Sequence, residues 1–188
     1  MNFHQVIGEV TSRLDAAGIR YGLIGGFAMA LRGVQRATVD LDFILMLEDM
    51  EKADSILQSS GYTRAFSNKN VSHYMGKEQE LGRIDIIHAF RGPTLGMLER
   101  VDRIEVVAGL TLPVVQIEDI IGLKIQATVN APGRASSDWA DIQMMLEVAG
   151  ECGNSIDWDL LQEYLGLFQL EDKLETLKQW YGTANRGR

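Results

Sequence analysis

Apolar residues recur along the chain with two different periods, and these periods predict which segments are helices and which are strands. Short apolar or alternating runs bounded by turn residues predict strands at 21–24, 39–47, 62–66, 71–75, 83–88, 104–107 and 110–115. Apolar residues three and four positions apart predict helices at 3–17, 27–31, 48–60, 94–100, 118–129, 136–149, 158–168 and 171–180. Because only helical spacing follows residue 116, we predict a mixed α+β domain over residues 1–116 and a helical subdomain over 117–188.

The stretch between the first two strands combines features that suit a phosphate and a metal ion. Gly25 and Gly26 follow an apolar strand and precede a short helix, a geometry that turns backbone N–H groups and the positive end of a helix dipole outward. Asp40 and Asp42 are two residues apart in the next strand, so both carboxylates point to the same face. Carboxylates so placed can hold a divalent cation over a phosphate.

Further residues are candidates to complete such a site. Asp85 is a solitary charge in an apolar strand, where burial is costly unless something binds it. Lys124 and Arg134, in the helical part, are candidates for contact with phosphates, although Lys124 alone also fits a solvated helix position. Arg36 and Thr38 either orient phosphate or cap the entry to the strand.

Other polar residues have simpler explanations. Asp138 and Asp141 are three apart on a helix and share a face, so they fit a cap and a salt bridge, or a contact with the base or the basic residues of the site. His88 has the opposite strand parity to Asp85 and should point away from it, and His73 lies on a hairpin strand. The absence of a histidine cluster disfavours zinc hydrolysis.

The composition is that of an ordinary globular protein of 188 residues, with 46% apolar and 23% charged residues. A formal net charge of −8 argues against non-specific coating of nucleic acid. The lone Cys152 allows no intramolecular disulfide or cysteine-based zinc site, and neither a signal peptide nor a membrane span is predicted, so we expect a cytoplasmic protein.

Taken together, these residues resemble the minimal nucleotidyltransferases of the polymerase-beta-like superfamily, and among them the AbiEii-type toxin nucleotidyltransferases. The resemblance covers roughly residues 20 to 146 and differs at Gly25-Gly26, where many members have Gly-Ser, although some toxins share the double glycine. The matching residues are Gly25-Gly26, Arg36-x-Thr38-x-Asp40-Leu41-Asp42-Phe43, Asp85, Leu123-Lys124, Arg134, Asp138 and Asp141.

The resemblance implies a small mixed sheet with flanking helices and a C-terminal helical bundle that closes the cleft. Asp40 and Asp42 would be paired ligands of Mg²⁺, with two ions expected and Mn²⁺ as a substitute, and Asp85 would be the third ligand or a base. Lys124 would meet the triphosphate, and Asp138 or Asp141 would match the final aspartate of the toxin branch.

The implied activity is transfer of NMP from a nucleoside triphosphate to an acceptor hydroxyl on tRNA, a protein or a small molecule. If the chain is a toxin, a cognate antitoxin is an expected partner; no membrane partner is expected. Two alternatives remain open: an antibiotic-modifying nucleotidyltransferase, which shares the site, and a non-catalytic nucleotide- or partner-binding protein that keeps the fold. Three carboxylates crowded together speak against the non-catalytic alternative.

Overall fold

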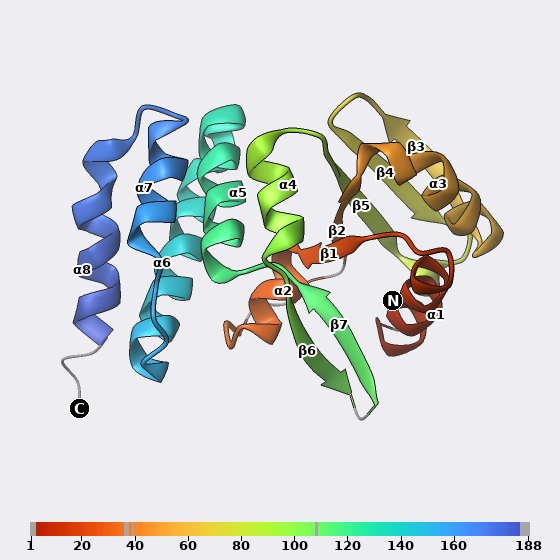
Figure 1. Ribbon diagram of the computed structural model, residues 1–188, viewed down its shortest axis with the longest axis horizontal. Coiled ribbons are helices and arrows are strands. Elements are labelled where there is room, and N and C mark those ends of the chain that lie inside the picture. Colours follow the sequence, from red (N-terminus) through yellow and green to blue (C-terminus); the bar gives the residue numbers. More distant parts are fainter. Residues whose placement is uncertain (1–2, 36–37, 39, 108, 185–188) are drawn as a thin grey trace. The chain divides into compact units, whose positions relative to one another are not determined.

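The computed structural model describes residues 3–35, 38, 40–107 and 109–184. These residues divide into two compact units (Figure 1). The first unit comprises residues 1–31 and 36–116, and the second comprises residues 32–35 and 117–188, in each case as far as the structure describes them.

The first unit is built on one mixed sheet, which contains seven strands within the described residues in the order β3-β4-β5-β2-β1-β7-β6. Strands β2 and β5 are parallel, as are β1 and β7, and the remaining neighbours are antiparallel. The strands are β1 (Tyr21–Ile24), β2 (Asp40–Met46), β3 (Tyr62–Ser67), β4 (Val71–Gly76), β5 (Arg83–Ala89), β6 (Asp102–Val107) and β7 (Leu110–Val114).

Side-chain alternation gives the β2–β5–β4 part of this sheet two different faces. Helix α3 lies beside β3 and β4 (Figure 1), and its Asp54 accepts a hydrogen bond from the buried Tyr74 of β4. Ile84 and Ile86 of β5 and Leu41 of β2 are buried on the same side as Tyr74. The opposite face therefore receives Asp40 and Asp42 of β2, His73 of β4, and Arg83 and Asp85 of β5. The helices of this unit are α1 (Phe3–Ala16), α2 (Gly25–Leu31), α3 (Met50–Ser59) and α4 (Gly92–Glu99).

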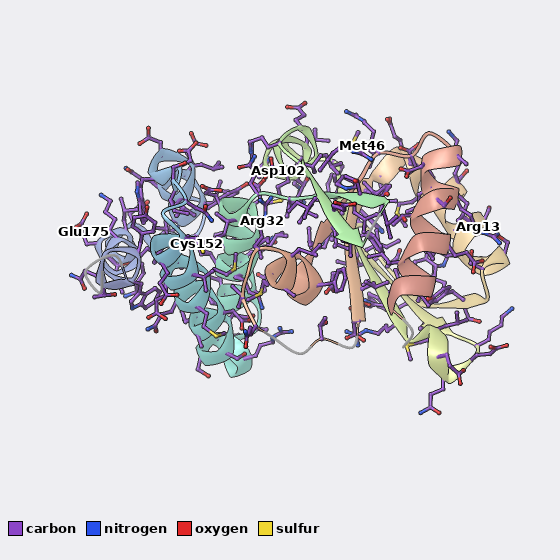
Figure 2. The ribbon with its side chains drawn as sticks, turned by 90° about the horizontal axis from the view of Figure 1, so that it is seen from below. Arg13, Arg32, Met46, Asp102, Cys152 and Glu175 are labelled. Atoms are coloured by element: carbon purple, nitrogen blue, oxygen red, sulfur yellow. The ribbon has the colours of Figure 1, made fainter. Side chains whose placement is uncertain are left out.

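The second unit is helical throughout its described elements: α5 (Ile117–Asn130), α6 (Ala135–Cys152), α7 (Trp158–Gly166) and α8 (Leu174–Ala184), with short 3₁₀ turns before α6 and α8. Buried polar contacts join α5 to α7. The Tyr164 hydroxyl donates to Asp119 at 2.6 Å, and Glu118 accepts the backbone N–H of Asp157 at 2.8 Å. Cys152 is exposed at the end of α6 (Figure 2).

The mixed α+β fold predicted from the sequence is confirmed. Helix α2 begins at Gly25 rather than at Phe27, so the two glycines form its first turn instead of preceding it. Helix α6 also extends three residues beyond the predicted end, to Cys152. No helix among the described residues is long and apolar enough to cross a membrane.

Candidate active site

Strand register brings the three predicted carboxylates together on the polar face of the sheet. Asp42 of β2 and Asp85 of β5 are directly paired in the parallel ladder, and Asp40 lies two residues before Asp42. Because residues two apart in a strand share a face, all three side chains point to the same side. The structure therefore brings Asp40, Asp42 and Asp85 to one face of the sheet, and their role as metal ligands stays a prediction.

Asp42 lies in a position that is unfavourable for a negative charge. Burial first, and then the negative charges of Asp85 and Asp40, raise the pKa of Asp42 from 3.8 to about 6. The Arg83 charge and a backbone hydrogen bond from Gly26 act in the opposite direction. Three carboxylates confined in this way form a site where added positive charge is stabilising.

Gly25 is required by the position of Asp42. Strand β1 ends with Ile24 paired to Asp42, so the chain turns directly beside that carboxylate. A Cβ atom at residue 25 would lie 2.1 Å from Asp42 Oδ2, and the backbone there has φ +67°, which favours glycine. The glycine and aspartate ends of the 25–42 stretch therefore contact each other.

Gly26 is confined by Thr38. A Cβ atom at residue 26 would lie 3.0 Å from both Cβ and Oγ1 of Thr38. The Thr38 hydroxyl therefore lies next to the position that the serine side chain of a Gly-Ser pair would take. Thr38 Oγ1 also donates to the Asp40 carbonyl at 3.2 Å, a contact at the entry to the strand, and its contact with phosphate stays a prediction. Arg36 lies outside the described residues.

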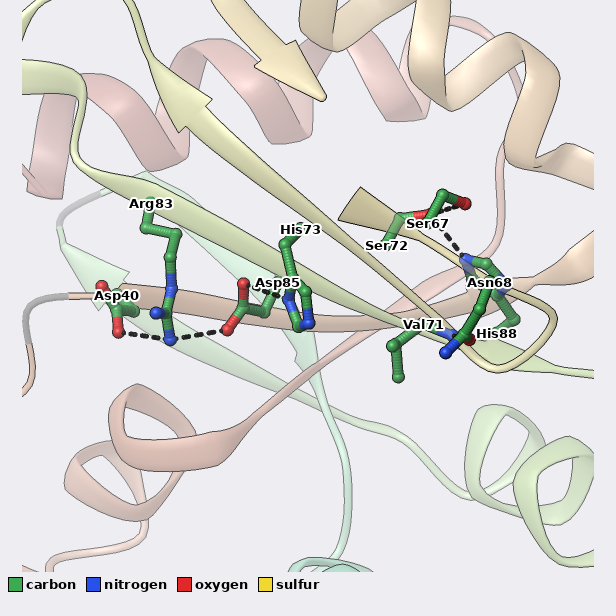
Figure 3. A network of polar contacts seen from close by, with 9 residues as sticks. All are labelled: Asp40, Ser67, Asn68, Val71, Ser72, His73, Arg83, Asp85 and His88. Atoms are coloured by element: carbon green, nitrogen blue, oxygen red, sulfur yellow. Dashed lines mark hydrogen bonds and ion pairs between the residues drawn. The ribbon is translucent and has the colours of Figure 1, made fainter. Parts of the chain in front are cut away.

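Two residues that the sequence did not single out contact the carboxylates (Figure 3). Arg83 Nη2 lies 2.9 Å from Asp40 Oδ2 and 2.8 Å from Asp85 Oδ2. His73 Nδ1 lies 2.8 Å from Asp85 Oδ1. The His73 ring also stacks on the ring of Phe66, with centroids 5.5 Å apart. Arg83 has the same strand parity as Asp85, a signal the sequence contains. The contact of His73 with Asp85 depends on the β4–β5 register, which the sequence does not give.

The donor set fits a divalent ion of the magnesium type. Oxygen ligands suit Mg²⁺, which binds through one or two carboxylates and completes its shell with water and substrate phosphates. Asp40 and Asp85 each place one oxygen against the same cationic nitrogen, so the two carboxylates can share a positive charge. Among the residues that the structure describes, no three His, Cys, Asp or Glu side chains form a preformed metal cluster. The binding of a divalent ion by these carboxylates stays a prediction.

The remaining predicted residues form a separate group in the second unit. Lys124 of α5 contacts both predicted aspartates of α6, with Nζ 2.8 Å from Asp138 Oδ1 and 2.5 Å from Asp141 Oδ2. The Lys124 side chain is 12% exposed and those of Asp138 and Asp141 are 1% and 6% exposed. Arg134 Nε lies 3.3 Å from Asp138 Oδ2. The structure thus places all four together as an ion-pair network, and their contact with nucleotide stays a prediction.

His88 lies on the opposite side of β5 from Asp85, as its parity predicts. It is 4% exposed and contacts Ser72 Oγ through Nε2 at 3.0 Å and the Lys69 carbonyl through Nδ1 at 3.1 Å. Since a carbonyl only accepts, Nδ1 carries the proton and Nε2 accepts from Ser72 in the neutral ring. Burial lowers the His88 pKa from 6.5, which favours this neutral form.

No protein-family model and no curated protein sequence matches the chain. Solved structures do match it. The solution structure of the antibiotic-resistance factor ANT(2″)-Ia has a TM-score of 0.64 at 14% identity, covering 97% of this chain and 100% of that one. The crystal structure of ANT(2″)-Ia with adenylyl-2″-tobramycin has a TM-score of 0.60 at 15% identity, covering 95% and 99%.

Two further solved structures have the same fold. Lincomycin-bound LnuA, a lincosamide antibiotic adenylyltransferase, has a TM-score of 0.55 at 14% identity, covering 77% of this chain and 96% of that one. An antigenic nucleotidyltransferase-like protein from Paracoccidioides brasiliensis has a TM-score of 0.54 at 18% identity, covering 94% and 92%. At these identities the likeness shows the fold alone: the chain shares its fold with these nucleotidyltransferase structures.

Proposed function

We propose that the chain is a metal-dependent nucleotidyltransferase that moves NMP from a nucleoside triphosphate to an acceptor hydroxyl. The observation that carries this proposal is the in-register pairing of Asp42 with Asp85 on neighbouring strands, with Asp40 on the same face. The fold is that of nucleotidyltransferases, and Gly25 keeps the space beside Asp42 clear of a side chain.

The chemistry assigns a task to each carboxylate. The acceptor oxygen attacks the α-phosphorus, a P–O bond forms, the bond to the β-phosphate breaks, and pyrophosphate leaves. Bound Mg²⁺ would neutralise charge on the phosphates and favour ionisation of the attacking hydroxyl. Asp40 and Asp42 would hold the ion, and Asp85 would be a further ligand or accept the proton that the hydroxyl loses. His73 would orient Asp85 through the contact at Oδ1.

A small-molecule hydroxyl is the acceptor that the comparisons favour. ANT(2″)-Ia was solved with adenylyl-2″-tobramycin and LnuA with lincomycin, so two proteins of this fold are associated with antibiotics. Transfer to a toxin target on tRNA or protein is the second candidate. It is favoured by the Gly25-Gly26 pair, which some AbiEii-type toxins share, and it would involve a cognate antitoxin.

A label-transfer assay tests the proposal. The protein is incubated with Mg²⁺ and each α-³²P-labelled nucleoside triphosphate, with tobramycin, lincomycin, total tRNA or protein as acceptor. We expect labelled acceptor with release of unlabelled pyrophosphate, and a loss of about a thousandfold in Asp42→Asn, since metal ligation is worth several kcal/mol in the transition state.

The matched control is Asp172→Asn, which removes an aspartate that is 68% exposed in the second unit and should leave the rate unchanged. Label transfer at full strength in Asp42→Asn would reject the mechanism. Calorimetry addresses the non-catalytic alternative, because nucleoside triphosphate binding that is indifferent to Mg²⁺ would favour a binding protein.

A further inference from the structure

One arginine side chain links two of the three site carboxylates. Arg83 begins β5, and its Nη2 atom lies within 2.9 Å of Asp40 and 2.8 Å of Asp85, residues from two neighbouring strands (Figure 3). Since strand register pairs Arg83 with Asp40, the guanidinium lies beside both carboxylates. Two proposed metal ligands therefore already share a cation that belongs to the chain.

His73 determines which oxygens remain for this cation. It contacts Oδ1 of Asp85 at 2.8 Å, so Arg83 contacts the other oxygen, Oδ2. Arg83 thus contacts one oxygen of each carboxylate, Oδ2 of Asp40 and Oδ2 of Asp85. A metal ion that binds both carboxylates through these oxygens must displace the guanidinium.

A metal ion can replace Arg83 in its contacts with the two carboxylates. Its side chain is 44% exposed, so solvent screens the two ion pairs and the long side chain has room to leave. A divalent ion carries twice the charge and binds carboxylate oxygens directly. Displacement is therefore favourable, but the ion must first overcome the existing pairs.

We propose that Arg83 is an internal counter-ion, which holds Asp40 and Asp85 in place without metal and competes with the divalent ion for them. The inference rests on the proposed function, because it takes these carboxylates as metal ligands. Arg83 is a positioning residue in this role. Because Arg83 competes with the ion, the site needs a higher concentration of metal for binding than the same carboxylates would need without Arg83.

Metal binding can be measured without catalysis. Mn²⁺ is titrated into the full-length protein without nucleotide, and the signal of free Mn²⁺ is followed by electron paramagnetic resonance. We expect Arg83→Gln to bind Mn²⁺ about tenfold more tightly than the unmodified protein, since it removes the competing charge. Arg83→Lys keeps a charge at this position and should bind Mn²⁺ with an affinity close to that of the unmodified protein.

Arg64→Gln is the matched control. Arg64 lies on β3, is 48% exposed and pairs with Asp54 of α3 at 3.4 Å, on the face opposite the carboxylates. The control should not change Mn²⁺ affinity. Circular dichroism and thermal unfolding verify that each variant is folded.

The outcomes separate the two proposals. Tighter binding in Arg83→Gln, together with unchanged binding in Arg83→Lys and Arg64→Gln, supports the inference. Equal or weaker binding in a folded Arg83→Gln overturns it, while Mn²⁺ binding that is lost in Asp42→Asn would leave the metal-dependent function standing. A protein that binds no Mn²⁺ in any form, and transfers no label, overturns both.

Discussion

The carboxylate of Asp42 lies in a part of the sheet where its ionisation is unfavourable. Its pKa is raised from 3.8 to about 6 by burial and then by Asp85 and Asp40, so the folded state binds a proton more tightly than the unfolded state. The stabilisation from this proton is complete below pH 3.8 and is lost as the pH rises through about 6. At neutral pH without metal, the ionised Asp42 therefore destabilises the fold.

We predict that Asp42→Asn raises the free energy of unfolding by about 2 kcal/mol at pH 7.5, because one pKa unit corresponds to about 1.4 kcal/mol and partial exposure reduces the effect. The gain should vanish near pH 4, where the aspartate is protonated. Urea unfolding in EDTA at both pH values measures it. A variant that is no more stable than the unmodified protein at pH 7.5 would contradict this account.

A side chain at the position of Gly25 would clash with Asp42, whereas a side chain at the position of Gly18 would meet no neighbour. Both have positive φ, +67° and +69°, but a Cβ at Gly18 meets nothing within 4 Å, whereas one at Gly25 would lie 2.1 Å from Asp42 Oδ2. We predict that Gly18→Ala costs about 1 kcal/mol of unfolding free energy from backbone strain alone. Gly25→Ala should cost about 3 kcal/mol, since overpacking is added.

Chemical denaturation of the two alanine variants measures the difference. Gly25→Ala should also reduce label transfer, because the Asp42 carboxylate must move to admit the methyl group. Equal destabilisation of the two variants would show that Asp42 moves away from the added methyl group without lowering the free energy of unfolding.

At this scale the sequence predicted the carboxylates but not their partners. Alternation along a strand is a local property, and it placed Asp40 and Asp42 on one face without knowledge of the neighbouring strands. The contact of Asp85 with His73 and the contact of Arg83 with Asp40 depend on how β4, β5 and β2 align. Such alignment follows from long-range packing, which spacing along the chain does not encode.

The pairing of helices α5 and α6 contains a buried ion-pair network rather than a purely apolar contact. Lys124 is 12% exposed and contacts Asp138 and Asp141, which are almost fully buried. We predict that Lys124→Met lowers the free energy of unfolding by about 3 kcal/mol, because two buried carboxylates lose the charge that compensates them. Thermal or urea unfolding measures the loss.

Two further variants test the cause of this loss. Adding Asp138→Asn and Asp141→Asn to Lys124→Met should recover most of it, since no uncompensated charge then remains. Lys178→Met in α8 removes an exposed lysine paired with Glu175 and should cost at most about 0.5 kcal/mol. If Lys124→Met is as mild as Lys178→Met, Lys124 has no major structural role.

At the scale of elements, the sequence predicted the type of most helices and strands but not the contacts that fix their ends. Helix α2 begins at Gly25 because the strand before it ends opposite Asp42 and the chain must turn there. A pair of glycines indicates a turn, yet it does not show that the turn is already helical. The Lys124 network was left open: a salt bridge or a contact with basic residues was among the interpretations for Asp138 and Asp141, but the sequence left the face of α5 that Lys124 occupies undetermined.

The charge of the whole chain bears on the acceptor. With 18 basic and 26 acidic residues, the net charge is −8, and the phosphates of an RNA acceptor would be repelled at long range. Binding to nucleic acid gains most of its non-specific affinity from counterions released by clustered Lys and Arg. A small acceptor has no such requirement, which agrees with the acceptor proposed above.

We therefore predict that the protein binds RNA weakly, with a Kd above about 100 μM at 150 mM salt, since non-specific sites rich in basic residues reach about 1–100 μM. Fluorescence anisotropy of labelled tRNA and of a single-stranded RNA, measured at 50 and 200 mM KCl, tests this. We expect little change between the two salt concentrations, because few cations on the protein displace counterions. Micromolar binding that weakens steeply with salt would instead reveal a local basic surface and make tRNA the preferred acceptor despite the overall acidity.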